Sequence, residues 1–62
     1  MKLYEYQTYD NFVCITFKNK LDDKVEFTVR DSGITVEADN VSLDELKKAI
    51  EIIESGKLEI TL

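Results

Sequence analysis

The sequence predicts an α+β fold in which a single antiparallel sheet carries one helix across one of its faces. Two hairpin-like pairs of strands in residues 2–39, an amphipathic helix after residue 42 and an alternating segment over 57–62 support this prediction. We expect the element order β-β-β-β-α-β in one small α+β domain spanning residues 1–62. Because each connection reverses the chain, the last strand runs antiparallel to the first, which predicts a five-stranded sheet with strand order 5-1-2-3-4.

The first hairpin is predicted from two runs of aromatic and β-branched residues, 2–9 and 12–18, separated by an Asp-Asn pair. Two residues that tolerate positive φ between strand-like runs are typical of a tight hairpin turn. If Tyr9 pairs with Phe12, alternate residues share a face. The face assigned to the core carries Tyr4, Tyr6, Thr8, Val13, Ile15 and Phe17. The opposite face carries Leu3, Glu5, Gln7, Tyr9, Phe12, Cys14, Thr16 and Lys18.

A second hairpin is predicted from residues 24–30 and 34–39, which alternate between apolar and polar side chains. This period of two indicates half-buried strands, and the Asp-Ser-Gly sequence at 31–33 supplies the turn. Loops of two and of four residues both keep the apolar side chains on one face, so both registers stay open.

The helix start is the sharpest local signal, because Ser42 is followed three residues later by Glu45 in the pattern of a capping box. Val41 and Leu46 flank this cap as a hydrophobic staple, and Gly56 is placed to end the helix. The helical face assigned to the core carries Leu43, Leu46, Ala49, Ile50 and Ile53. The expected core of the whole domain consists of Val25, Phe27, Val29, Ile34, Val36, Leu46, Ile50, Ile53, Leu58 and Ile60.

Composition excludes several classes of function. Thirteen acidic against eight basic residues give a net charge of −5, so we expect no direct nucleic-acid binding and no binding to an anionic membrane. The absence of His and the single Cys exclude a Ser-His-Asp triad, a Cys-His pair and an internal disulfide. Turn formation and helix capping account for the acidic clusters, so we predict no enzyme, no cofactor and no metal site. The chain opens without a signal-peptide pattern, which predicts a cytoplasmic protein.

One helix leaves the second face of the sheet uncovered, and this face carries apolar side chains at several positions. A further apolar residue lies outside the core stripe of the helix. The predicted protein-binding residues are Leu3, Tyr9, Phe12, Cys14 and Ile52. The alternative is that these are scattered surface residues, which are normal in soluble proteins, and that Cys14 simply packs as a small apolar side chain.

These observations predict a small acidic, non-enzymatic protein-binding module that self-associates and inhibits or modulates a partner protein. Its size and acidity are typical of small phage or mobile-element proteins that redirect host proteins, including defence systems, and this comparison rests on size and composition alone. The alternative is a nucleic-acid mimic that blocks a DNA-binding protein with its carboxylates. Lysines between the acidic residues argue against the contiguous negative charge that a mimic needs.

We expect a twofold-symmetric homodimer, because the core is small and exposed apolar surface is commonly buried by closed symmetry. One route stacks the open faces through Tyr9 and Phe12. The other continues the sheet through the short fourth strand, where Glu37 and Asp39 can repel a symmetry mate. Face stacking is therefore the preferred route.

Overall fold

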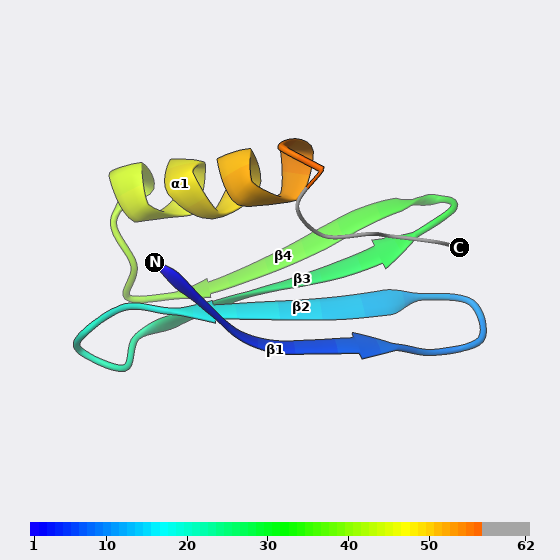
Figure 1. The fold of residues 1–62 in the computed structure, drawn as a ribbon, viewed down its shortest axis with the longest axis horizontal. Coiled ribbons are helices and arrows are strands. Elements are labelled where there is room, and N and C mark those ends of the chain that lie inside the picture. Colours follow the sequence, from blue (N-terminus) through cyan, green and yellow to red (C-terminus); the bar gives the residue numbers. More distant parts are fainter. Residues whose placement is uncertain (57–62) are drawn as a thin grey trace.

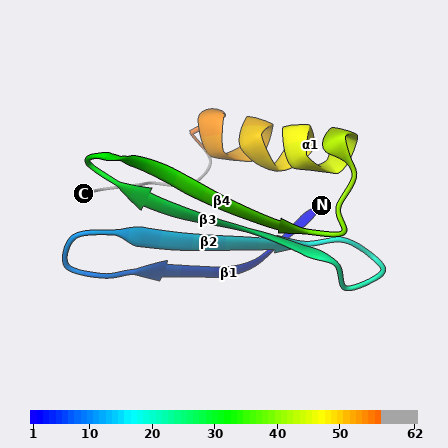
Figure 2. The ribbon, with the colours of Figure 1, turned by 180° about the vertical axis from the view of Figure 1, so that it is seen from behind.

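The computed structural model describes residues 1–56, which form one antiparallel sheet and one helix (Figure 1). The strands are β1 (Lys2–Thr8), β2 (Val13–Lys18), β3 (Lys24–Arg30) and β4 (Gly33–Asp39), and the helix is α1 (Leu43–Glu54). Each strand pairs with the next along the chain, which gives the strand order β1-β2-β3-β4. The helix packs on one side of this sheet, and Figure 2 shows the same arrangement from behind.

The predicted five-stranded sheet with the order 5-1-2-3-4 is wrong, because the sheet of the described residues has four strands. The predicted fifth strand covers residues 57–62, which lie outside the described part of the chain. Alternation predicts a strand only where a regular neighbouring edge can take its backbone hydrogen bonds. The expected neighbour is β1, whose register with β2 shifts between Leu3 and Glu5. A β-bulge of this kind twists an edge strand and interrupts its regular edge, which the predicted order does not take into account.

Both hairpins close through two-residue turns. The Tyr9 N–H donates to the Phe12 carbonyl oxygen at 2.8 Å, which confirms the predicted start of the first hairpin. Arg30 pairs with Gly33, which selects the two-residue loop from the two lengths that the sequence allows. Gly33 has a φ of 147°, a backbone conformation that favours glycine. β4 follows directly from this turn and runs for seven residues.

The bulge in β1 changes the facing of the residues that precede it. Leu3 lies opposite Phe17, the position that the unbroken register assigns to Tyr4. Tyr4 is turned out of the core and exposes 61% of its surface, so its predicted core position is wrong. One inserted residue is enough to move a side chain from one face of a sheet to the other, because side chains alternate with a period of two.

The helix has the predicted termini. The Ser42 Oγ accepts the N–H of Glu45 at 3.1 Å, and the Ser42 N–H donates to Glu45 Oε1 at 3.0 Å, which confirms the capping box. At the other end, the Ser55 N–H donates to the Glu51 carbonyl oxygen at 2.9 Å. Gly56 follows with a φ of 78°, in the left-handed region that commonly ends a helix.

The core lies between α1 and the two central strands. Ala49 is the one residue of α1 that is fully buried, and partly buried apolar side chains of α1 and of the segments before β1 and α1 surround the contact. The buried apolar residues are Val13, Ile15, Phe17, Val25, Phe27, Val29 and Ala49.

The predicted core is right for β3 and wrong for β4 and for two positions of α1. Leu43, which the sequence places on the core face of the helix, exposes 68% of its surface. Thr8, which the sequence places on the core face of the first hairpin, is exposed as well. Ile34, Val36 and Ile50 expose 59%, 45% and 37% of their surface. A helix is only about 10–12 Å across, whereas four strands about 4.8 Å apart, with their side chains, are wider. α1 therefore covers β2 and β3 through Ala49 and leaves the helix side of β4 open. Two further predicted core residues lie outside the described part of the chain: Leu58 and Ile60.

Replacing Phe17 by Ala tests this core, because Phe17 is the largest fully buried side chain. We expect a loss of about 3–5 kcal/mol in the free energy of unfolding. That is comparable to the whole stability of so small a domain, which is roughly 3–9 kcal/mol. Urea unfolding followed by circular dichroism measures the loss. The control is Leu21→Ala in the β2–β3 turn, where 81% exposure predicts a change within about 0.5 kcal/mol. Equal losses in the two variants would contradict the core.

Candidate protein-binding surface

The sheet face opposite α1, called the open face below, is built from rows of side chains that cross the strands. The antiparallel registers align alternate residues of neighbouring strands, so each row takes one residue from each strand or from the position directly beside it. The row nearest the turns that follow β1 and β3 contains Tyr9, Phe12 and Arg30, and is called the aromatic row. The next row is uncharged and polar, with Gln7, Cys14, Thr28 and Thr35, and is called the neutral row. The two remaining rows are charged.

An aromatic cluster occupies the end of the open face near the turns. The rings of Tyr9 and Phe12 stack with their centroids 4.5 Å apart and their planes 15° apart. The Arg30 guanidinium carbon lies 5.3 Å from the Phe12 centroid, within the range of a cation–π interaction. Tyr9 exposes 49% of its surface and its hydroxyl donates to Gln7 Oε1. We call Tyr9, Phe12 and Arg30 the aromatic corner.

Cys14 lies next to the aromatic corner, in the neutral row. Its Sγ is 4.0 Å from the Thr28 Oγ1, across the β2–β3 pairing. The thiol is half-buried, and its neighbours in this row are Gln7 on β1 and Thr28 on β3. Cys14 therefore packs as a small side chain at the edge of the aromatic cluster.

The structure brings together three of the five residues predicted as a binding site. Tyr9, Phe12 and Cys14 share one end of the open face. Leu3 lies at the far end of β1, opposite Phe17, because the bulge turns it to the helix side. Ile52 packs half-buried against the core, so its predicted orientation away from the core stripe is wrong.

Arg30 is the residue of the aromatic corner that the sequence argument does not include. It belongs to the aromatic row because Val29 pairs with Val13, which places the next residue of β3 beside Phe12. The alternation of residues 24–30 places Arg30 on the polar face of its strand. It does not show that Arg30 lies beside Phe12 until the register between β2 and β3 is known.

The two charged rows have opposite signs. Glu5, Glu26 and Glu37 share a row with Thr16, and we call these three residues the acidic row. Two residues further along the strands, the basic row crosses the same face. The basic row consists of Lys2, Lys18 and Lys24, and Asp39 ends it.

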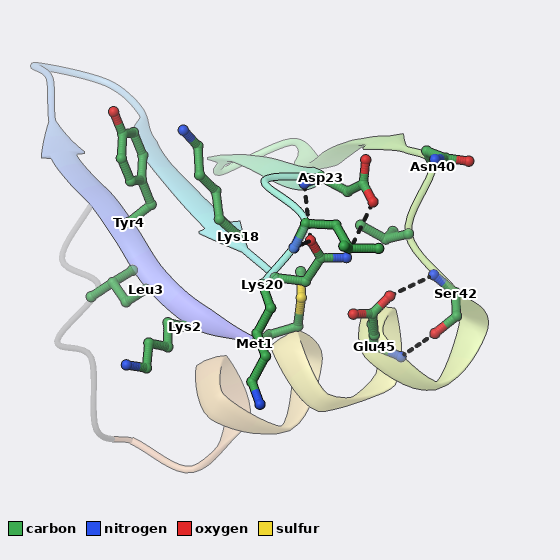
Figure 3. A pocket seen from close by; sticks show the side chains of 13 residues that line it. Met1, Lys2, Leu3, Tyr4, Lys18, Lys20, Asp23, Asn40, Ser42 and Glu45 are labelled. Carbon is green, nitrogen blue, oxygen red and sulfur yellow. Dashed lines mark hydrogen bonds between the residues drawn. The ribbon is translucent and has the colours of Figure 1, made fainter.

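Lys18 is the fixed member of the basic row. Its Nζ lies 3.1 Å from Asp22 Oδ1 and 3.7 Å from the centroid of the Tyr4 ring. Figure 3 shows the two side chains next to each other. The hydrogen bond to the Asp22 carboxylate raises the pKa of Lys18 above its ordinary value. Asp22 has a φ of 67°, which the β2–β3 turn requires.

A hollow lies at the start of α1, where β1, the β2–β3 turn and the β4–α1 loop meet (Figure 3). Asn19 organises its wall, because its Oδ1 accepts the N–H groups of Leu21 and Asp23, each at 2.9 Å. Among the described residues, no buried side-chain nitrogen or oxygen lacks a hydrogen-bond partner. The printed hydrogen bonds of Asn19, Ser42 and Glu45 thus hold the β2–β3 turn and the start of α1 in place beside this hollow.

Glu45 lines this hollow, and its carboxylate also caps the start of α1. The hydrogen bond from the Ser42 backbone N–H, followed by one from the Asn19 side chain, lowers the pKa of Glu45 below its ordinary value. The position in the first turn also favours a negative charge, because the N-terminal end of a helix carries partial positive charge.

Neither metal binding nor membrane crossing is indicated within the described residues. In residues 1–56, no three His, Cys, Asp or Glu side chains come close enough to hold a metal ion. Over the same residues, no helix combines the length and the apolar character that a bilayer crossing requires.

Comparison with protein-family models, with curated proteins and with solved structures gives no match to this chain.

Glu45→Gln tests the charge at the helix start. A carboxyl whose pKa is lowered on folding stabilises the protein above its ordinary pKa, and this contribution disappears as the pH falls through the lowered value. We expect wild type to be more stable than Glu45→Gln at pH 7, and the difference to shrink as the pH falls below about 4. Urea unfolding at several pH values measures it. Glu54→Gln, at the last residue of α1, is the control and should not lose stability at pH 7. A difference between wild type and Glu45→Gln that is independent of pH would contradict the assignment.

Proposed function

We propose that this protein is a non-enzymatic protein-binding module that inhibits or modulates a partner protein by occupying the partner's surface. The observation that carries the proposal is the aromatic corner, a stacked pair of rings with a guanidinium beside it on the uncovered face of the sheet. Tyr, Phe and Arg are enriched at the buried centres of protein interfaces. Their side chains dominate binding energy where they fill a partner's pocket.

The internal contacts of the aromatic corner support this role. Tyr9 is held by stacking on Phe12 and by the hydrogen bond to Gln7, and Phe12 also contacts Arg30. Side chains that are already ordered lose less conformational freedom on binding, so more of their contact energy contributes to affinity. Tyr9 nevertheless keeps half of its surface exposed, which leaves an apolar ring face free for a partner.

The charged rows supply the rim of the proposed interface. The acidic row and the basic row lie on the same face as the aromatic corner, beyond the neutral row. Charges at an interface rim guide association and select the partner, and they add little affinity. The proposed partner therefore carries an apolar pocket beside a surface with charge of both signs.

The charge pattern favours protein binding over nucleic-acid mimicry. A mimic needs a continuous stripe of negative charge, whereas on the open face the acidic row is bordered by the basic row. On α1, Asp44 forms an ion pair with Lys48, with Asp44 Oδ2 and Lys48 Nζ 3.4 Å apart. We place the partner in the cytoplasm, where a free thiol such as that of Cys14 stays reduced.

Phe12→Glu is the variant that tests the proposed function. The tagged full chain is used to capture proteins from the cells that encode it, and the captured partner is then purified and titrated by calorimetry. We expect Phe12→Glu to weaken binding by at least about tenfold, because truncation of a central aromatic residue typically costs about 2 kcal/mol or more.

The matched control is Leu21→Glu, the same change of an apolar residue to a carboxylate at an 81% exposed position in the β2–β3 turn. Leu21→Glu should bind like wild type. A partner that binds Phe12→Glu with unchanged affinity would refute the proposal, as would equal losses in the two variants.

A further inference from the structure

Within residues 1–56, no strand pairs with the outer edge of β4. All seven residues of β4 are exposed, and within residues 1–56 its one neighbour in the sheet is β3. Proteins usually protect such an edge with a bulge, a proline or charged side chains, especially lysine, which discourage pairing with another chain. The other edge strand, β1, has a bulge, whereas β4 keeps an unbroken register with β3 over its whole length and contains neither proline nor lysine. β4 is therefore the edge that can accept a further strand.

Apolar side chains extend from this edge onto the helix. Ile34 and Val36 lie on the helix side of β4, because they pair with Val29 and Phe27, whose side chains enter the core. On α1, Leu43 and Ile50 are 68% and 37% exposed and stand seven residues apart, so they share one helical face. We call Ile34, Val36, Leu43 and Ile50 the apolar strip.

The position of Met1 shows which way the helical part of the strip faces. Met1, just before β1, lines a small hollow together with Lys48 and Ile52, so these residues mark the side of α1 that faces β1. Leu43 and Ile50 lie on the opposite side of the helix, about 100–180° away around its axis. They therefore face in the direction of the β4 edge.

The backbone groups at the β4 edge follow from the hairpin. In antiparallel pairs, residues that exchange hydrogen bonds alternate with residues that do not. Arg30 and Gly33 close the two-residue turn, so Gly33 and every second residue after it bond to β3. The N–H and C=O groups of the intervening residues point to the free edge: Ile34, Val36 and Ala38.

We propose that β4 pairs antiparallel with β4 of a second copy of this chain, about a twofold axis that passes through Val36. In this register Val36 faces its own counterpart, and Ile34 of each copy faces Ala38 of the other. All three positions direct backbone groups to the edge, so they can exchange hydrogen bonds across the axis. A twofold axis perpendicular to the sheet keeps both helices on the same side, which joins the two apolar strips into one surface.

The acidic residues of β4 select this register and do not prevent it. On the open face, Glu37 of one copy faces Thr35 of the other, and Asp39 faces Gly33. An axis through Glu37 would place two carboxylates directly opposite each other, which is unfavourable. An axis through Thr35 would pair only part of the strand. The register through Val36 is the one that uses all seven residues without a carboxylate opposite another.

The occupant is a second copy, because β4 is complementary to itself. Apolar positions meet apolar positions on the helix side, and each carboxylate meets an uncharged residue on the open face. The pairing gives an eight-stranded sheet over the described residues of two copies, with β1 at each outer end. The bulges in β1 then protect both remaining edges, so the assembly closes as a dimer and does not extend.

Two lysine substitutions on neighbouring residues test the dimer. Val36→Lys places two ammonium groups opposite each other at the axis, and we expect it to shift the mass from two chains of 7.2 kDa to one. Thr35→Lys makes the same change one residue away, opposite Glu37 of the other copy, and should keep the dimer. Sedimentation equilibrium of the full chain at micromolar concentrations measures the mass, and circular dichroism verifies that both variants are folded.

Amide hydrogen exchange gives a second measurement on the unaltered protein. Protection of the amides of Ile34, Val36 and Ala38 should increase with protein concentration, while that of Thr35 and Glu37, bonded to β3, should not. A wild type that is monomeric at every concentration would overturn the proposal. This holds whether the three amides exchange fast or are protected from exchange by another part of the same chain. A dimer that survives Val36→Lys and is lost in Phe12→Glu would overturn it in favour of stacking through the open face. Loss of the dimer in Val36→Lys with partner binding intact would support the β4 dimer and would show that partner binding does not depend on it.

Discussion

The limited width of one helix is the constraint on which the rest of this structure depends. α1 buries Ala49 against β2 and β3, and these two strands supply all the other fully buried apolar residues. A second layer of this size cannot reach across four strands, so the helix side of β4 stays exposed and no second element of residues 1–56 covers the open face. The exposed apolar strip and the exposed aromatic corner are both consequences of this incomplete cover.

Features fixed by local chemistry could be predicted from the sequence, and features fixed by packing could not. The turn between Tyr9 and Phe12 and the cap formed by Ser42 and Glu45 depend on residues that are neighbours in the chain, and both are confirmed. The bulge between Leu3 and Glu5 leaves no mark in the alternation of residues 2–9. It moves Tyr4 out of the core and Leu3 away from the open face, and it interrupts the regular edge of β1.

The candidate site follows the same division. Tyr9, Phe12 and Cys14 lie close to the first turn, where the predicted register holds, so the sequence places them together. Arg30 joins them through the pairing of β2 with β3, which the pattern of either strand alone does not specify. The helix side of β4 shows the converse case, since its alternation is that of a half-buried strand and yet Ile34 and Val36 remain exposed.

The two proposed interfaces lie on different parts of the molecule. The aromatic corner is on the open face beside the turns, whereas the apolar strip is on the helix side at the β4 edge. A dimer through β4 therefore leaves both aromatic corners free, and one assembly can hold two partner molecules. Two linked sites increase the apparent affinity for a partner that is itself multivalent, because the second contact forms within one complex.

Nuclear Overhauser contacts of the Ala49 methyl group test the central claim, that α1 covers only the two middle strands, most directly. If α1 covers only these two strands, this methyl contacts the buried side chains of β2 and β3 and makes no contacts to Ile34 or Val36. An Ala49 methyl without contacts to the sheet, together with contacts from Ile50 into the β2–β3 core, would mean that a different face of α1 is buried and would contradict the account.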